Sequence, residues 1–194
     1  MSGPARREVG RRGVPSPLGG DPAPPGENVV LALGSNLGAR LDILQGGVTA
    51  IAALPGVAVT AVSPVYETVP VGGPAQPDYL NAVVLARTTL APRDLLKHLH
   101  EVEAAFDRIR VVRWGPRTLD IDIITYQGVT SEDPELTLPH PRAHERAFVL
   151  APWHDADPAA ELPGHGPVAS LLDAVSQQAP GQGIRRAAEG LSVP

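Results

Sequence analysis

The order of the apolar segments constrains the fold more than any other feature of this sequence. Between residues 28 and 124 the pattern reads strand, helix, strand, strand, helix, strand. The six segments are residues 28–33, 39–54, 57–66, 79–86, 92–106 and 119–124. This order is typical of the α+β, ferredoxin-like βαββαβ sandwich, in which two helices cover one face of an antiparallel sheet. We expect the first and fourth strands to lie together in the middle of that sheet.

The two helices have recognisable core faces. In the second helix one stripe follows at i, i+4, i+7 and i+11, and Pro92 stands near the first helical position. Its members are Leu95, Leu99, Val102 and Phe106. The first helix is expected to bury Ile43, Val48, Ile51 and Leu54. Before it, Gly34-Ser35-Asn36 is either a phosphate-cradling turn or a plain turn in which Ser35 or Asn36 caps the helix.

The fourth strand alternates apolar and acidic side chains. Leu119, Ile121 and Ile123 fall on one face, and Asp120 and Asp122 fall on the other. Paired carboxylates repel each other unless a cation compensates them, and Mg²⁺ is commonly held by one or two carboxylates together with substrate phosphates. The alternative is the solvated face of an edge strand with arginines as ion-pair partners. A central position for this strand would favour the metal site.

Arginines and an aromatic residue precede the acidic pair. Arg113 and Arg117 carry planar guanidinium groups suited to phosphate oxygens, and Trp114 has a flat face for stacking on a ring. Lys97 is the only lysine among 16 basic residues, and it lacks the glycine-rich context of a P-loop. A P-loop NTPase is therefore excluded. Phosphate recognition must come from arginine, histidine, backbone N–H groups or metal.

Composition excludes further classes. The chain has no cysteine, so disulfides, thiolate metal sites and cysteine nucleophiles are ruled out. A net charge of −5 argues against a nucleic-acid partner. No apolar run reaches membrane-spanning length and no signal peptide is recognisable, so we expect a cytoplasmic protein without a membrane partner. His140 and His144 at i, i+4 suggest a zinc pair, but His140 with Arg146 as phosphate contacts fits the arginine-rich context better.

The chain divides into three parts. Residues 1–27 are rich in Gly, Pro and Arg without apolar periodicity, which predicts a disordered arm. Residues 28–186 are expected to form one domain, and residues 187–194 a tail. After the fourth strand we predict a C-terminal extension with a hairpin returning at residues 136–138, an irregular stretch over 152–167, a short helix over 168–177 and a final short strand. We expect a monomer.

Five motifs together resemble a known family. They are residues 32–38, 63–68, 76–82, 113–122 and 139–142, and the most specific is Arg113-Trp114-Gly115-Pro116-Arg117-Thr118-Leu119-Asp120-Ile121-Asp122. In this order they resemble the 6-hydroxymethyl-7,8-dihydropterin pyrophosphokinases of folate biosynthesis, over about residues 29–152. The resemblance implies transfer of pyrophosphate from ATP to the hydroxymethyl group of 6-hydroxymethyl-7,8-dihydropterin, with release of AMP.

The resemblance also implies roles for individual residues. The metal ligands are Asp120 and Asp122, with two Mg²⁺ ions expected, and the catalytic residues are these two with Arg108 and Arg117. The expected ATP contacts are Glu103, Arg110, Arg113, Trp114, Arg117, His140 and Arg146. The expected pterin contacts are Thr68, Val69, Val71, Tyr79, Asn81, Trp114 and Phe148.

Two other classes compete with this reading. An Asp-x-Asp glycosyltransferase using a nucleotide sugar would explain Asp120 and Asp122, but it leaves His140, Arg146 and the pterin-contact residues without a role. A ferredoxin-like RNA-binding module would need exposed aromatic residues on its sheet, and only 4% of this chain is aromatic. The pyrophosphokinase accounts for the largest number of residues.

Overall fold

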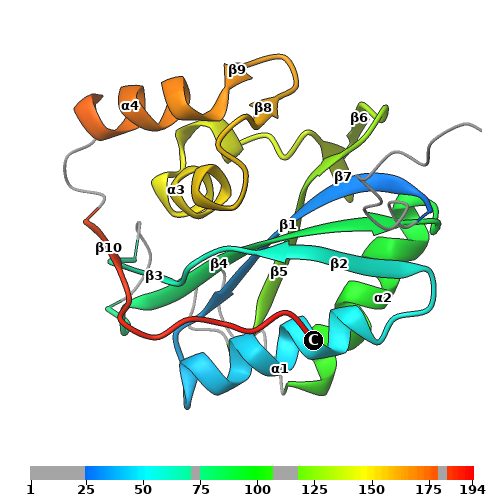
Figure 1. Cartoon of the computed structure of the whole chain (residues 1–194), viewed down its shortest axis with the longest axis horizontal. Helices are drawn as coiled ribbons and strands as arrows, with labels where there is room; N and C mark the ends of the chain where they lie inside the picture. The colour runs from blue at the N-terminus through cyan, green and yellow to red at the C-terminus, as the bar shows by residue number, and fades with distance from the viewer. Residues whose placement is uncertain (1–24, 71–74, 107–117, 179–182) are drawn as a thin grey trace, which may run out of the picture.

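The computed structural model describes residues 25–70, 75–106, 118–178 and 183–194. Its central unit follows the predicted order of strands and helices (Figure 1). The elements are β1 (Glu27–Ser35), α1 (Arg40–Ala52), β2 (Val57–Val62), β3 (Tyr66–Thr68), β4 (Tyr79–Thr88), α2 (Pro92–Ala105) and β5 (Asp120–Tyr126). The single strand predicted over 57–66 is divided into β2 and β3. Pro64, which has no N–H to donate to a ladder, stands between them.

The predicted C-terminal extension is present. It consists of β6 (Ser131–Asp133), β7 (Leu136–Leu138), the 3-10 helix η1 (Ala143–Glu145), α3 (Ala147–Ala156), β8 (Glu161–Leu162), β9 (Gly166–Pro167), α4 (Val168–Gln178) and β10 (Ile184–Arg186). The prediction that 152–167 is irregular is wrong in part, because α3 continues through Pro152 and a small β8–β9 hairpin follows. Burial of Leu150 and Trp153 outweighs the one hydrogen bond that Pro152 cannot donate.

β1 is an interior strand of the sheet. It pairs antiparallel with β4 on one side and with β5 on the other, in the order β10-β3-β4-β1-β5, and β2 also pairs with β4. The predicted neighbourhood of the first and fourth strands is confirmed. The prediction that the Asp-bearing strand is central is wrong, because among the described residues no strand pairs with the far edge of β5. The N–H of His140 donates to the carbonyl of Ile124 at that edge (2.8 Å).

Helices cover both faces of this sheet (Figure 1). On one face, α1 and α2 bury a cluster that includes Leu31, Leu44 and Leu99. This is the predicted two-helix layer. On the opposite face, α3 and α4 pack through a second cluster that includes Val83, Leu150 and Trp153. The C-terminal extension therefore adds a third layer.

The helix faces differ in detail from the predictions. α1 buries Leu44, Gly47, Val48 and Ile51, whereas Ile43 and Leu54 are only partly buried. No side-chain hydrogen bond caps α1, so of the two alternatives for Gly34-Ser35-Asn36 the helix cap by Ser35 or Asn36 is not seen. In α2 the stripe of Leu95, Leu99 and Val102 is confirmed; Phe106 is partly buried and Glu103 takes the last buried position. No helix of the described residues is long and apolar enough to cross a membrane.

The residues after β10 contact α1. The Ser192 N–H donates to Gln45 Oε1 (2.8 Å), and Gln45 Nε2 donates to the Ser192 carbonyl (3.1 Å). Ala187 and Leu191 pack on the cluster beneath α1 and α2. In Figure 1 this segment crosses α1 and ends beside it.

We expect Leu31→Ala to lower the free energy of unfolding by about 3 kcal/mol, because a fully buried leucine leaves a cavity on an interior strand. Leu191→Ala removes the same atoms from a partly buried position and should cost about 1 kcal/mol or less. Urea denaturation followed by circular dichroism measures both variants. Equal losses would contradict the assignment of β1 as the centre of the core.

Candidate active site

The strand register places polar residues in a row across the sheet. Asn81 of β4 lies opposite Gly34 of β1, which in turn lies opposite Asp120 of β5. Directly opposed residues of an antiparallel pair point to the same face. Val83, two residues beyond Asn81, belongs to the cluster under α3, so this row lies on the α3 side. With strands about 4.8 Å apart, Asn81 and Asp120 are about 10 Å apart across a floor at Gly34.

Asp122 occupies the next position on the same face, beside two side chains of the C-terminal extension. Its Oδ2 lies 3.6 Å from Arg146 Nη1 and 3.8 Å from His140 Nε2. Arg146 Nη1 and His140 Nε2 are 3.4 Å apart. The edge bond from His140 to Ile124 and the start of α3 at Ala147 bring these residues to the acidic strand.

Burial sets the charges of this cluster. Desolvation, followed by the positive charge of Arg146, lowers the pKa of His140 to about 4. His140 is therefore neutral at neutral pH. Desolvation also lowers the pKa of Arg146, while the carboxylate of Asp122 opposes that shift. Since arginine keeps its proton at physiological pH, Arg146 supplies a positive charge next to Asp122.

The acidic pair suits a cation that is completed by phosphate. No group of three or more His, Cys, Asp or Glu side chains within the described ranges is arranged to hold a metal. That observation speaks against the zinc pair of His140 and His144; the ring of His144 instead stacks on that of His165, with centroids 4.2 Å apart. Asp120 and Asp122 share one face at i, i+2, and Mg²⁺ is commonly held by one or two carboxylates plus substrate phosphates. The residues present fit such an ion.

The predicted pterin contacts lie at the other end of the row. Asn81 is 6% exposed and Thr68 is 7% exposed, and Asn81 Nδ2 donates to Thr68 Oγ1 (2.8 Å). Tyr79, two residues before Asn81 on β4, donates its hydroxyl to Gln76 Oε1 (3.2 Å). Val69 is exposed, and its N–H donates to the carbonyl of Gly183 (3.4 Å). The structure thus gathers these predicted contacts around the β3–β4 connection.

Phe148 belongs to α3. The guanidinium carbon of Arg146 lies 5.4 Å from the centre of its ring, a cation–π contact. Phe148 is thereby linked to the acidic end of the site.

Glu103 has a structural contact in the described residues. It is fully buried at the end of α2, and its Oε1 accepts the N–H of Ile121 (2.8 Å). Ile121 stands between Asp120 and Asp122, so Glu103 supports the backbone of the acidic strand. Its predicted contact with ATP stays a prediction. Arg108, Arg110, Arg113, Trp114, Arg117 and Val71 lie outside the described residues, and their predicted roles also stay predictions.

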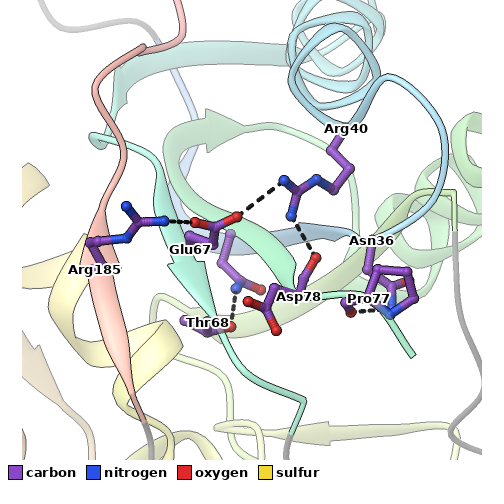
Figure 2. Close-up of polar contacts among 8 residues, drawn as sticks. Asn36, Arg40, Glu67, Thr68, Pro77, Asp78 and Arg185 are labelled. Carbon is purple, nitrogen blue, oxygen red and sulfur yellow. Dashed lines mark hydrogen bonds and ion pairs between the residues drawn. The ribbon is translucent and has the colours of Figure 1, made fainter. Parts of the chain in front are cut away.

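A second group of polar residues lies beside β3, and the sequence analysis predicted no contacts among its members. Arg40 contacts Glu67 and the carbonyl of Asp78, and Asn36 donates to the carbonyl of Pro77 (Figure 2). They line a pocket of about 420 Å³ together with Leu37 and Gly38. In the sequence this group is marked only by two charged residues, Arg40 at the start of a helix and Glu67 beside Thr68. Neither signal reveals a contact between the two.

Comparison with known proteins identifies the family. The sequence model of 7,8-dihydro-6-hydroxymethylpterin-pyrophosphokinase (HPPK) matches residues 30–158. The chain belongs to this family. The 2-amino-4-hydroxy-6-hydroxymethyldihydropteridine pyrophosphokinase of Mycobacterium bovis is 47% identical over 157 residues, which cover 74% of this chain and 81% of the relative. That of Pseudomonas aeruginosa is 40% identical over 160 residues, covering 82% of this chain and 96% of the relative. The sequence-based prediction of a pyrophosphokinase of folate biosynthesis is confirmed.

Solved structures agree on the fold of this HPPK family member. The wild-type Plasmodium falciparum HPPK-DHPS crystallised with pterin and p-hydroxybenzoate superposes with a TM-score of 0.62 at 15% identity, covering 82% of this chain and 45% of that chain. A second HPPK-DHPS, in complex with substrates, gives a TM-score of 0.62 at 12% identity. This chain spans less than half the length of these solved chains. At such low identity the likeness supports the predicted ferredoxin-like architecture alone.

We expect Gly34→Ala to impair the pterin end of this site. A Cβ at residue 34 would lie 3.2 Å from Asn81 Oδ1 and 3.7 Å from Tyr79 Cδ1, and Asn81 is held by its bond to Thr68. The displaced amide should raise the KM for the pterin by about tenfold, equivalent to one weakened hydrogen bond. Steady-state kinetics with each substrate varied in turn measures this, with Gly190→Ala as control, since nothing lies within 4 Å of a Cβ there and its backbone is not in the left-handed region. An unchanged KM for the pterin would contradict the close approach of residue 34 to the Asn81 side chain.

Proposed function

We propose that this chain binds Mg²⁺–ATP at Asp120 and Asp122 and transfers the terminal pyrophosphate to 6-hydroxymethyl-7,8-dihydropterin, giving AMP and the pterin diphosphate. The observation that carries this proposal is the row from Asn81 through Gly34 to Asp120 on one face of the sheet. It puts a buried amide suited to a polar ring about 10 Å from carboxylates suited to a metal. One bound pterin, with its hydroxymethyl group toward β5, spans that distance.

The acidic end provides charge neutralisation. Asp120 and Asp122 would hold the Mg²⁺, with two ions expected, and the bound metal would neutralise the developing charge on the transferring phosphates. Arg146, 3.6 Å from Asp122, carries a fixed positive charge for a phosphate oxygen. His140 is neutral, so its N–H donates a hydrogen bond to phosphate without adding charge to the cluster.

The other end provides recognition of a flat, polar ring. Asn81 uses one N–H on Thr68, which leaves its carbonyl oxygen and a second N–H for donors and acceptors on a pterin edge. Tyr79 and Phe148 supply aromatic faces for stacking. The backbone of Val69 lies next to Thr68 at the same end. Orientation of the hydroxymethyl group toward the phosphates is the main task, because phosphoryl-type transfer asks the protein mostly for positioning and charge stabilisation.

The residues proposed for both ends of this site belong to one chain, and a monomer remains the expected active unit. Arg108, Arg110, Arg113, Trp114 and Arg117 would complete the phosphate side in the roles that the family resemblance implies. Glu103 would support this site in two ways: it accepts a hydrogen bond from the N–H of Ile121, between the two aspartates, and it would make its predicted contact with ATP.

The identity of the nucleotide product tests the proposal. With ATP, Mg²⁺ and 6-hydroxymethyl-7,8-dihydropterin, chromatography should detect AMP and no ADP. Chelation of the metal with EDTA should abolish product formation, and added Mg²⁺ should restore it. ADP as the product, or AMP formation that needs no pterin, would contradict the assignment.

We expect Asp122→Asn to lower turnover by at least about a hundredfold while the fold persists, because the change removes a negative charge from the metal position without altering its size. Asp173→Asn makes the same chemical change at an exposed position on α4 and should leave turnover unaltered. Turnover is measured at saturating ATP, and far-ultraviolet circular dichroism monitors the fold. Unfolding of Asp122→Asn alone would indicate a structural carboxylate instead.

A further inference from the structure

The connection between β3 and β4 runs from Thr68 to Tyr79, two of the predicted pterin contacts. Arg40 contacts the residue that precedes each of them. Arg40 Nη2 donates to Glu67 Oε1 (3.1 Å), and Arg40 Nη1 donates to the carbonyl of Asp78 (2.7 Å). Glu67 immediately precedes Thr68, and Asp78 immediately precedes Tyr79. A single guanidinium from the start of α1 therefore bridges the two ends of the connection (Figure 2).

Glu67 is a well-formed partner for this arginine. Its hydrogen bond with Arg40, followed by that with Arg185, lowers the pKa of its carboxyl, so Glu67 is ionised at neutral pH. The side chains of Arg40 and Glu67 are 30% and 21% exposed, whereas that of Arg185 is 79% exposed. Exposed ion pairs contribute little to stability. The partly buried contact of Arg40 is accordingly the stronger of the two.

A second element holds the same end of the connection. Asn36, 1% exposed in the turn between β1 and α1, donates its Nδ2 to Gln76 Oε1 (3.0 Å) and to the carbonyl of Pro77 (3.1 Å). Gln76 Oε1 also accepts the hydroxyl of Tyr79. Residues 76–79 are thus fixed from β1 and from α1. β3 has only three residues, which pair with β4 on one edge and with β10 on the other, and Thr68 lies opposite Tyr79 in the β3–β4 ladder. The bridge through Arg40 adds to this short ladder at the point where the connection leaves it.

We propose that Arg40 is a positioning residue for pterin binding, acting through Glu67 and the Asp78 carbonyl on the placement of Thr68, Tyr79 and Asn81. The inference rests on the proposed function for the identity of the ligand. The planar fork of arginine reaches both acceptors at once, which a lysine ammonium does less well. Part of this network comes from outside the region that the family model matches, because Arg185 belongs to β10.

The test compares Arg40→Gln with Arg93→Gln, which removes an exposed arginine of α2 that forms an ion pair with Asp133 of β6. Arg40→Gln should raise the KM for the pterin by about tenfold and leave the KM for ATP within about twofold. Arg40→Lys should recover part of the loss. Arg93→Gln should change neither constant. Equal changes in both KM values, or no change in Arg40→Gln, would overturn the proposal.

A double-mutant cycle with Glu67→Gln separates positioning from general destabilisation. If the two side chains act as one unit, the double variant should be no more than about twofold worse in pterin KM than Arg40→Gln alone. If the increases in pterin KM of the two single variants were fully additive in the double variant, Arg40 and Glu67 would act independently and the proposal would be overturned. Thermal unfolding of each variant shows whether the fold is retained.

Hydrogen exchange gives a readout that does not depend on activity. In Arg40→Gln the amides of residues 78–81 should exchange faster than in the parent chain, while those of α2 stay unchanged. If the parent chain formed no AMP, the proposed function would fail, yet this exchange difference would still report on Arg40. Unchanged exchange at residues 78–81 would overturn the positioning role.

Discussion

The pairing of β1 on both of its edges is the constraint on which the rest of the structure depends. β4 and β5 are distant in sequence, and only their common register with β1 brings Asn81, Gly34 and Asp120 into one row. The same strand buries Leu31 and Leu33 under α1 and α2. A shift of one residue would turn the polar row toward the helices and the leucines toward the site. Core packing and site geometry are therefore fixed by the same register.

The third layer gives the sheet its chemistry. α3 and the segment before it cover the open face, and they deliver His140, Arg146 and Phe148 beside the acidic strand. Burial keeps His140 neutral, so the positive charge near Asp122 comes from Arg146. On an edge strand whose face is open to water, Asp120 and Asp122 would be ordinary solvated carboxylates. Under this layer the acidic pair lies against a partly desolvated cation, where a charged phosphate gains more from the contact than it would in water.

Much of this arrangement is legible in the sequence. The order of strands and helices follows from apolar periodicity, and the alternation of residues 119–124 separates the carboxylates from the core. The extended apolar stripe of α2 likewise identifies Leu95, Leu99 and Val102 as buried. The site motifs indicated the family, and 40–47% identity to curated relatives confirms that prediction. Wrong predictions concern the sheet edge and the stretch around Pro152, where packing between distant segments outweighs local preference.

The sequence by itself determined the element order, the family and the residue types of the site, because each is written in local spacing and motif. Only the tertiary structure decided that β5 ends the described sheet, that Glu103 supports Ile121 and that Arg40 joins Glu67 to Asp78. The contact of Glu103 spans 18 positions of the sequence, and the two contacts of Arg40 span 27 and 38. No periodicity encodes such pairs. Their geometry follows from how the sheet and its two helical layers close around one another.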